Sequence, residues 1–184
     1  MRITDRIAAL RPATLTISIG AIFFASSFNL LLPFGSAAWS IFYVLAMLLL
    51  MTLVLGWHYS IYRAASDRSV MFVGHSGRRA FLFVLCAIAT LLFLATFQVA
   101  IWLPIDPDNQ AMHVISFAAM PAACFSYFAS IWASANALVR FDEQKKHVET
   151  HKTLGSFILQ FYFFIGIWFI YPRIKRMLAA PLPA

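Results

Sequence analysis

The chain has 184 residues, of which 62% are hydrophobic and only 11% are charged, and its formal net charge is +7. Soluble domains average about 45–50% apolar and about 25% charged residues, so this composition excludes an ordinary soluble domain and indicates a protein surrounded by lipid. The net positive charge does not indicate nucleic-acid binding, because the Lys and Arg residues lie beside apolar runs, as is typical of membrane proteins. Cys86 and Cys124 lie inside apolar runs without metal-ligand spacing, so we interpret them as packing residues.

The N-terminal region combines a basic segment with the first apolar run. Residues 1–12 carry three arginines and apolar side chains at helical spacing, which predicts a short interfacial helix. The uncharged run 13–32 is long enough to cross a hydrocarbon core about 30 Å thick. A signal peptide is the alternative, because residues 36–38 resemble a small-residue cleavage site. We favour a retained span, since the run exceeds the usual apolar core of about 7–15 residues and a second span follows at once.

Further apolar runs follow along the chain and define the fold class. The predicted spans are residues 13–32, 39–62, 80–103 and 112–139, with a fifth at residues 154–171. We therefore predict an all-α, polytopic integral membrane protein, with residues 1–184 forming a single transmembrane helical domain.

The basic residues predict which side of the membrane each connection faces. Three Lys and Arg residues lie in the N-terminal segment, four in the loop 63–79 and four in the loop 140–152, whereas the turns 33–38 and 104–111 hold none. Under the positive-inside rule this count places the N-terminus in the cytoplasm of a bacterial inner membrane. The two turns without basic residues then face the periplasm.

The run 154–171 has two interpretations. A complete crossing carries the basic cluster 173–176 to the outside, whereas a re-entrant element that pivots at Gly166 keeps it inside. We predict a crossing, because upstream spans dominate orientation and a segment this apolar normally inserts. Its bulky aromatic residues, including Phe161, Phe164 and Trp168, then form a docking face.

Chemistry inside the predicted spans is limited, because none of the five runs contains Asp, Glu, Lys or Arg. Coupled transporters and intramembrane hydrolases usually need such groups, so we expect no catalytic residues and no cofactor. The polar side chains of interest within the spans are Asn29, His58, Gln98, Asn136 and Gln160. They predict interhelical hydrogen bonds worth about 0.6 kcal/mol each, and the alternative is a polar vestibule for a solute. His58 does not indicate bis-histidine haem, because no second histidine lies at a matching depth.

A weak metal-site pattern lies in the loop after the fourth span. Glu143, His147 and His151 are spaced four apart, so on a helix they share one face and could bind zinc. The local string His-Val-Glu-Thr-His is not the HExxH motif. We favour a solvated helix extension over a metal site.

The fourth span carries the clearest packing signal. Ala122, Ser126, Ser130 and Ser134 recur every four residues. Small side chains at this spacing allow two helix backbones to approach closely in a membrane. This pattern predicts a buried helix–helix contact along that ridge.

Three functional hypotheses follow from these observations. The first is a non-catalytic inner-membrane subunit or interaction protein that associates with another membrane protein or with itself, in contact with the bilayer and not with nucleic acid. The second is a small oligomeric channel or transporter for a small solute. The third is a membrane enzyme with a His/Glu metal site on its cytoplasmic side.

Overall fold

The computed structural model describes residues 3–27, 31, 36–69, 76–102, 110–144 and 148–181. These residues form an all-α fold of seven helices. The helices are α1 (Ile3–Ala8), α2 (Pro12–Ser27), α3 (Ala37–Arg68), α4 (Ser76–Trp102), α5 (Gln110–Glu143), α6 (Thr150–Phe161) and α7 (Phe163–Ala179).

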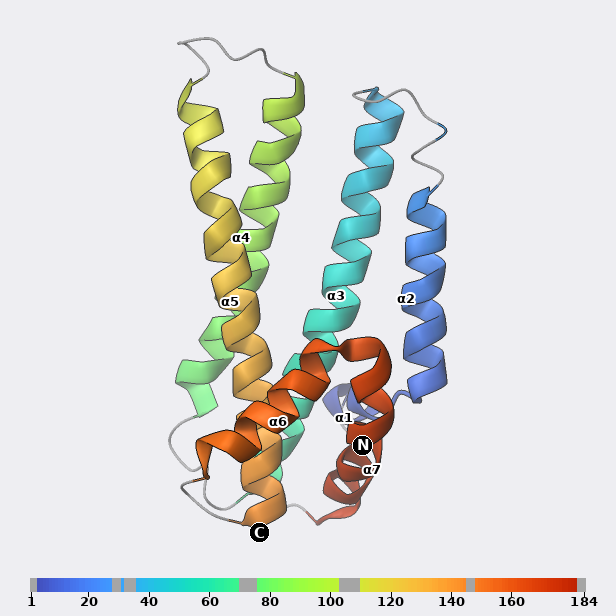
Figure 1. The fold of residues 1–184 in the computed structure, drawn as a ribbon, viewed down its shortest axis with the longest axis vertical. Helices are drawn as coiled ribbons and strands as arrows, with labels where there is room; N and C mark the ends of the chain where they lie inside the picture. Colours follow the sequence, from blue (N-terminus) through green and yellow to red (C-terminus); the bar gives the residue numbers. More distant parts are fainter. Residues whose placement is uncertain are drawn as a thin grey trace.

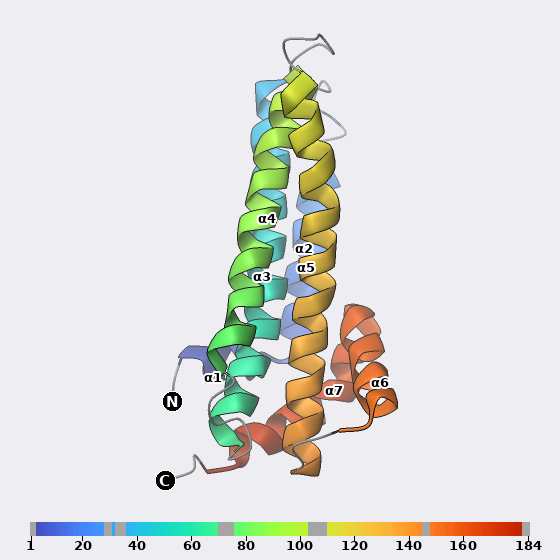
Figure 2. The same cartoon turned by 90° about the vertical axis from the view of Figure 1, so that its left-hand side faces the viewer.

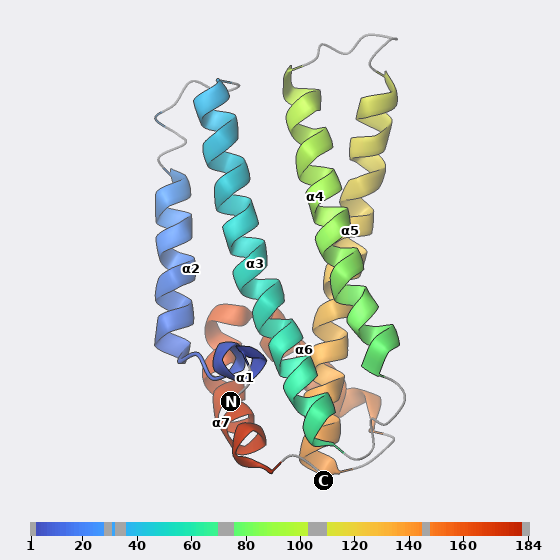
Figure 3. The ribbon, with the colours of Figure 1, turned by 180° about the vertical axis from the view of Figure 1, so that it is seen from behind.

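Four of the helices form an antiparallel bundle of two pairs, α2 with α3 and α4 with α5 (Figure 1). The pairs meet at the lower end of the bundle, where α3 packs against α5 and α4, and they diverge toward the upper end (Figure 3). The side view shows α6 and α7 against one face of the lower half only (Figure 2). The small helix α1 packs on α3 at the same end.

The helices extend beyond the predicted spans at their lower ends. The segment 63–79 was predicted as a loop, but α3 continues to Arg68 and α4 begins at Ser76. The continuation of α3 is supported by an ion pair one helical turn apart, Arg63 Nε to Asp67 Oδ1 at 3.3 Å. At its other end α3 begins at an N-cap, where the Ser36 hydroxyl accepts the Trp39 N–H at 3.2 Å.

The hydrophobic core lies at the lower end, where α1, α6 and α7 cover α3 and α5. Its fully buried large side chains come from four helices. They are Leu15 of α2, Trp57, Ile61 and Tyr62 of α3, Leu138 of α5, and Ile167, Ile170, Ile174 and Met177 of α7.

The predicted fifth span is wrong as a single helix, because residues 154–171 belong to two helices that form a hairpin. Helix α6 ends at Phe161 and α7 begins at Phe163, with Tyr162 between them at φ −80° and ψ 60°. The hairpin rises part of the way along the bundle and returns to the end from which it started (Figure 1). The break suits the side-chain pattern, because Thr153, Ser156 and Gln160 then point inward and are buried.

Gly166 is the residue that allows the hairpin to close. A Cβ atom at this position would lie 1.5 Å from the carbonyl oxygen of Leu159 and 2.3 Å from its carbonyl carbon. The predicted pivot therefore lies four residues after the break, where the backbone of α7 lies against that of Leu159 in α6. Only glycine fits there, because the atoms it meets belong to backbone.

Two of the described helices are long and apolar enough to cross a membrane, namely α3 and the segment His113–Glu143 of α5. Shorter apolar segments lie at Pro12–Ala25 and Leu82–Ala95. Length and composition alone are weak evidence for a membrane, since a core helix of a soluble protein meets the same criteria.

Candidate functional site

A layer of buried polar side chains lies between the helices of the lower half. His58 of α3, Ser134 of α5 and Gln160 of α6 are all at most 1% exposed. The Nδ1 atom of His58 lies 2.7 Å from the carbonyl oxygen of Val54, which identifies Nδ1 as the donor and fixes the neutral tautomer. The same ring meets the backbone of Gln160, so the layer joins α3 to the hairpin.

Gln160 is the least satisfied member of this layer. Neither its amide nitrogen nor its amide oxygen has a hydrogen-bond partner among the described residues. Burying an amide without a partner typically costs about 1–3 kcal/mol. The position of Gln160 is therefore maintained by the packing around it rather than by its own polar contacts.

The other predicted intramembrane polar residues have different outcomes. Asn136 of α5 donates from Nδ2 to the Thr153 hydroxyl of α6 at 3.3 Å, an interhelical hydrogen bond. Asn29 lies outside the described residues. Gln98 belongs to α4, but its side chain is outside the described part.

Of the three candidate metal ligands, the structure describes Glu143 and His151, and each contacts another charged side chain. The Glu143 carboxylate pairs with Lys152 Nζ at 2.6 Å, and this hydrogen bond raises the pKa of Lys152 above its ordinary value. His151 is exposed and lies 3.4 Å from Glu149 Oε2. His147 lies outside the described residues. Within the described ranges there is no group of three His, Cys, Asp or Glu residues placed to hold a metal ion.

The small-residue ridge on α5 is buried over three of its four positions. Ser126, Ser130 and Ser134 are at most 2% exposed, whereas Ala122 is exposed. The Ser130 hydroxyl donates to the Ser126 carbonyl at 2.8 Å and lies 3.5 Å from the Leu82 carbonyl of α4. The ridge therefore contacts α4 in its lower part and ends before Ala122.

A charged cavity of about 610 Å³ lies where α5, α6 and α7 meet. Arg173 of α7 donates from Nε to Asp142 Oδ2 at 2.5 Å, and its Nη1 lies 3.5 Å from the Ser156 hydroxyl. Glu143 and Lys152 line the same cavity. This site was not predicted from the sequence, because it follows from the return of α7 beside the end of α5.

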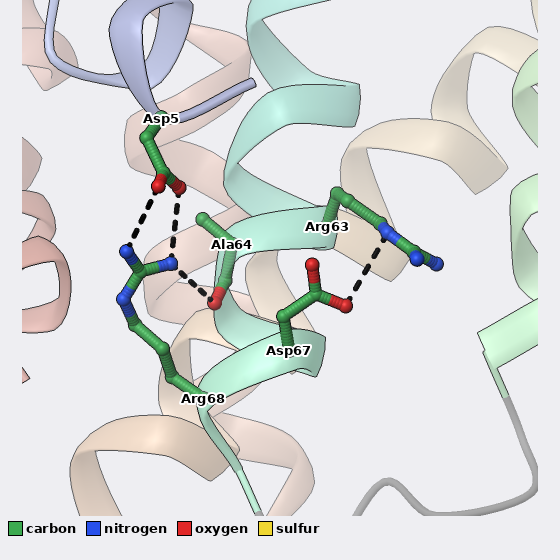
Figure 4. A network of polar contacts seen from close by, with 5 residues as sticks. All are labelled: Asp5, Arg63, Ala64, Asp67 and Arg68. Atoms are coloured by element: carbon green, nitrogen blue, oxygen red, sulfur yellow. Dashed lines mark hydrogen bonds and ion pairs between the residues drawn. The ribbon is translucent and has the colours of Figure 1, made fainter. Parts of the chain in front are cut away.

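A second ion pair fixes α1 to the end of α3 (Figure 4). Both Asp5 oxygens accept hydrogen bonds from Arg68, from Nη1 at 3.0 Å and from Nη2 at 3.1 Å. The two side chains are only 8% and 7% exposed. The Arg68 Nη1 atom also lies 3.4 Å from the Ala64 carbonyl.

An apolar groove of about 480 Å³ runs between α3 and α4. Small residues line both of its sides, Thr52 and Gly56 on α3 and Ala87 and Thr90 on α4. A Cβ atom at Gly56 would meet nothing within 4 Å. This groove was not predicted from the sequence, although the four-residue spacing of Thr52, Gly56 and Ser60 is a signal of close helix packing.

No family model, no curated protein and no solved structure matches this chain.

Proposed function

We propose that this chain is a multi-span helical protein of a bacterial inner membrane and acts there as a non-catalytic interaction or assembly subunit. The inverted polarity of the fold supports the membrane location. Only 6% of the most apolar 18-residue stretch of α3, and 24% of the corresponding stretch of α5, is buried inside the protein. The polar side chains of His58, Ser130 and Gln160, by contrast, are buried. Water would disfavour such an arrangement, whereas lipid favours apolar side chains outside and polar groups inside.

The distribution of charge supports the orientation. The charged residues of the described ranges lie in α1, at the lower ends of the long helices, and at the base of the hairpin, and basic residues predominate among them. The positive-inside rule places that end in the cytoplasm. The N-terminal helix and the end of α7 then share the cytoplasmic side.

The hairpin fits a re-entrant element that enters the membrane from the cytoplasmic side. Between Leu154 and Phe169 its exposed large side chains are apolar, whereas the buried side chains of α6 include the polar Thr153, Ser156 and Gln160. The exposed large residues are Leu154, Ile158, Phe161, Tyr162, Ile165, Trp168 and Phe169. Phe161 and Trp168, two residues of the aromatic docking face predicted for a fifth span, lie on this hairpin surface, where lipid is the first partner. The side chain of Phe164, the third, is outside the described part.

The observation that carries the interaction role is the open space beside Gly56 in the groove between α3 and α4. A mid-helix glycine costs about 1 kcal/mol relative to alanine, and here no segment of the described chain packs against it. Small residues on both sides of the groove leave the two backbones accessible to a third helix. The partner is a transmembrane helix of another membrane protein.

A photo-cross-linking experiment in living cells tests this partner. A photoreactive residue in place of Ile88, which lines the groove and is half exposed, should give one discrete adduct with a different polypeptide. Gly56→Leu should remove the adduct by filling the groove. The matched control is Gly20→Leu, because Gly20 of α2 also faces open space but lies outside the groove.

The outcomes of this experiment are distinct. Loss of the adduct in Gly56→Leu but not in Gly20→Leu supports the proposal. Adducts with lipid alone show that the groove holds acyl chains, and an adduct of twice the chain mass shows self-association. Either of these results contradicts a heterologous partner.

A further inference from the structure

We propose that the cavity between α5, α6 and α7 binds the headgroup of a zwitterionic aminophospholipid, a phosphoethanolamine lipid of the cytoplasmic leaflet. This inference rests on the membrane location in the proposed function and does not depend on the partner helix. At about 610 Å³, the cavity falls within the range of about 300–1,000 Å³ that is usual for small-molecule sites.

The cationic side of the cavity suits a phosphate. Arg173 directs Nε toward Asp142 and one Nη1 hydrogen toward Ser156, which is two of the five N–H donors of a guanidinium group. A guanidinium fork matches the oxygens of a phosphate geometrically. Lys152 adds a second cation on α6, with a side chain that is 42% exposed.

The anionic side of the cavity suits an ammonium group. Asp142 and Glu143 end α5 and line the same cavity as the two cations, so its charged side chains balance. A simple anion entering the cavity would meet both carboxylates, and a simple cation would meet Arg173 and Lys152. A ligand that carries phosphate and ammonium a few atoms apart satisfies both signs at once.

The apolar lining indicates that this zwitterion belongs to a lipid. Val139, Ile158 and Leu159 complete the cavity, and Ile158 is also exposed on the outer face of α6. Leu154 continues that exposed apolar face. Acyl chains can therefore follow the hairpin surface into the bilayer while the headgroup stays at the level of the charged residues.

The test measures lipid binding to the full-length protein after purification in a delipidating detergent. Native mass spectrometry is carried out with phosphatidylethanolamine, phosphatidylglycerol and phosphatidylcholine of identical acyl chains. We expect one phosphatidylethanolamine molecule to bind at a lower concentration than either of the other lipids. Lys152→Gln and Arg173→Gln should each weaken that binding about tenfold, the effect of losing one charge-assisted hydrogen bond.

Two variants separate recognition from general effects. Arg176→Gln is the control, because Arg176 is exposed on the same helix and does not line the cavity. Asp142→Asn removes a partner for the ammonium group and leaves both cations, so the preference for phosphatidylethanolamine over phosphatidylglycerol should be lost. Because this preference is a ratio within one preparation, partial unfolding of the variant does not change it.

Several results would overturn the inference. Equal or tighter binding of phosphatidylglycerol by the wild-type protein would show ordinary attraction of a basic surface for anionic lipid. Absence of a discrete lipid complex, or an unchanged preference in Asp142→Asn, would also contradict it. Absence of the protein from the membrane fraction of cells would instead contradict the proposed function itself.

Discussion

Asp5 and Arg68 form a buried, two-point ion pair between α1 and the end of α3, although 63 residues separate them in the sequence. Breaking a buried pair by removing one partner costs about 3–5 kcal/mol, because the remaining charge stays buried and uncompensated. We therefore expect Asp5→Ala to lower the stability of the protein in detergent by about 3 kcal/mol, measured as the free energy of unfolding.

The neighbouring pair on α3 provides the matched control for that prediction. Arg63 and Asp67 form an ion pair in the same region (Figure 4). The Arg63 side chain, however, is 38% exposed. Asp67→Ala should therefore cost no more than about 0.5 kcal/mol. Replacing Asp5 and Arg68 together by Leu should recover most of the stability lost in Asp5→Ala. Equal costs at Asp5 and Asp67 would contradict a special role for the buried pair.

Closure of the hairpin depends on Gly166. Gly166→Ala should destabilise the protein by at least about 1–3 kcal/mol, the usual cost of overpacking, because the added Cβ meets backbone atoms of Leu159. Gly155→Ala in α6 should be neutral or stabilising by up to about 1 kcal/mol, since a Cβ there meets nothing within 4 Å. Thermal unfolding of the two variants in the same detergent gives the comparison. A Gly166→Ala protein as stable as wild type would show that the hairpin opens easily.

The serine ridge of α5 gives a third prediction. Ser130→Leu should destabilise the protein by about 1–3 kcal/mol, because its fully buried side chain lies against the Leu82 carbonyl of α4. Ala122→Leu, on the same four-residue repeat but exposed, should change the unfolding temperature little. If both variants were equally tolerated, the ridge would not be a tight helix contact.

The course of the hairpin predicts the location of the C-terminal region. A green fluorescent protein fused after residue 184 should be fluorescent, and alkaline phosphatase fused at the same position should be inactive. The physical reason is that α7 returns to the end of the bundle that carries the basic residues. An active phosphatase fusion would contradict the hairpin and support the complete crossing predicted from the sequence.

Periodicity and apolarity were sufficient to predict an all-α fold and to locate the long helices, because an uncharged run of about twenty residues has few alternatives. They were insufficient at residues 154–171, where a continuous apolar run conceals a break at Tyr162. What distinguishes the hairpin from a span is the placement of Thr153, Ser156 and Gln160 on one face and the close approach at Gly166. Both depend on contacts with other helices, which a single run of sequence does not contain.

The candidate sites show the same contrast between what a local run of sequence predicts and what depends on contacts between helices. His58 and Gln160 were identified as polar residues within apolar runs, and they meet across α3 and α6. Arg173 and Asp142 were not connected by the sequence, because no local spacing relates residues 31 positions apart. Likewise, Gly56 became informative only when the groove showed that nothing in the described chain fills the space beside it.

The hairpin also sets the order in which the protein is completed during synthesis. Helices α3 and α5 are made first, and the surface that receives Gln160 and Ile167 exists only once both helices are in place. In the orientation proposed above, the hairpin then closes from the cytoplasmic side as a late step, after the long helices have reached their final places. A chain truncated before α6 leaves His58 without the cover of Gln160, so a quality-control protease that recognises polar groups exposed to lipid would distinguish unfinished molecules from finished ones.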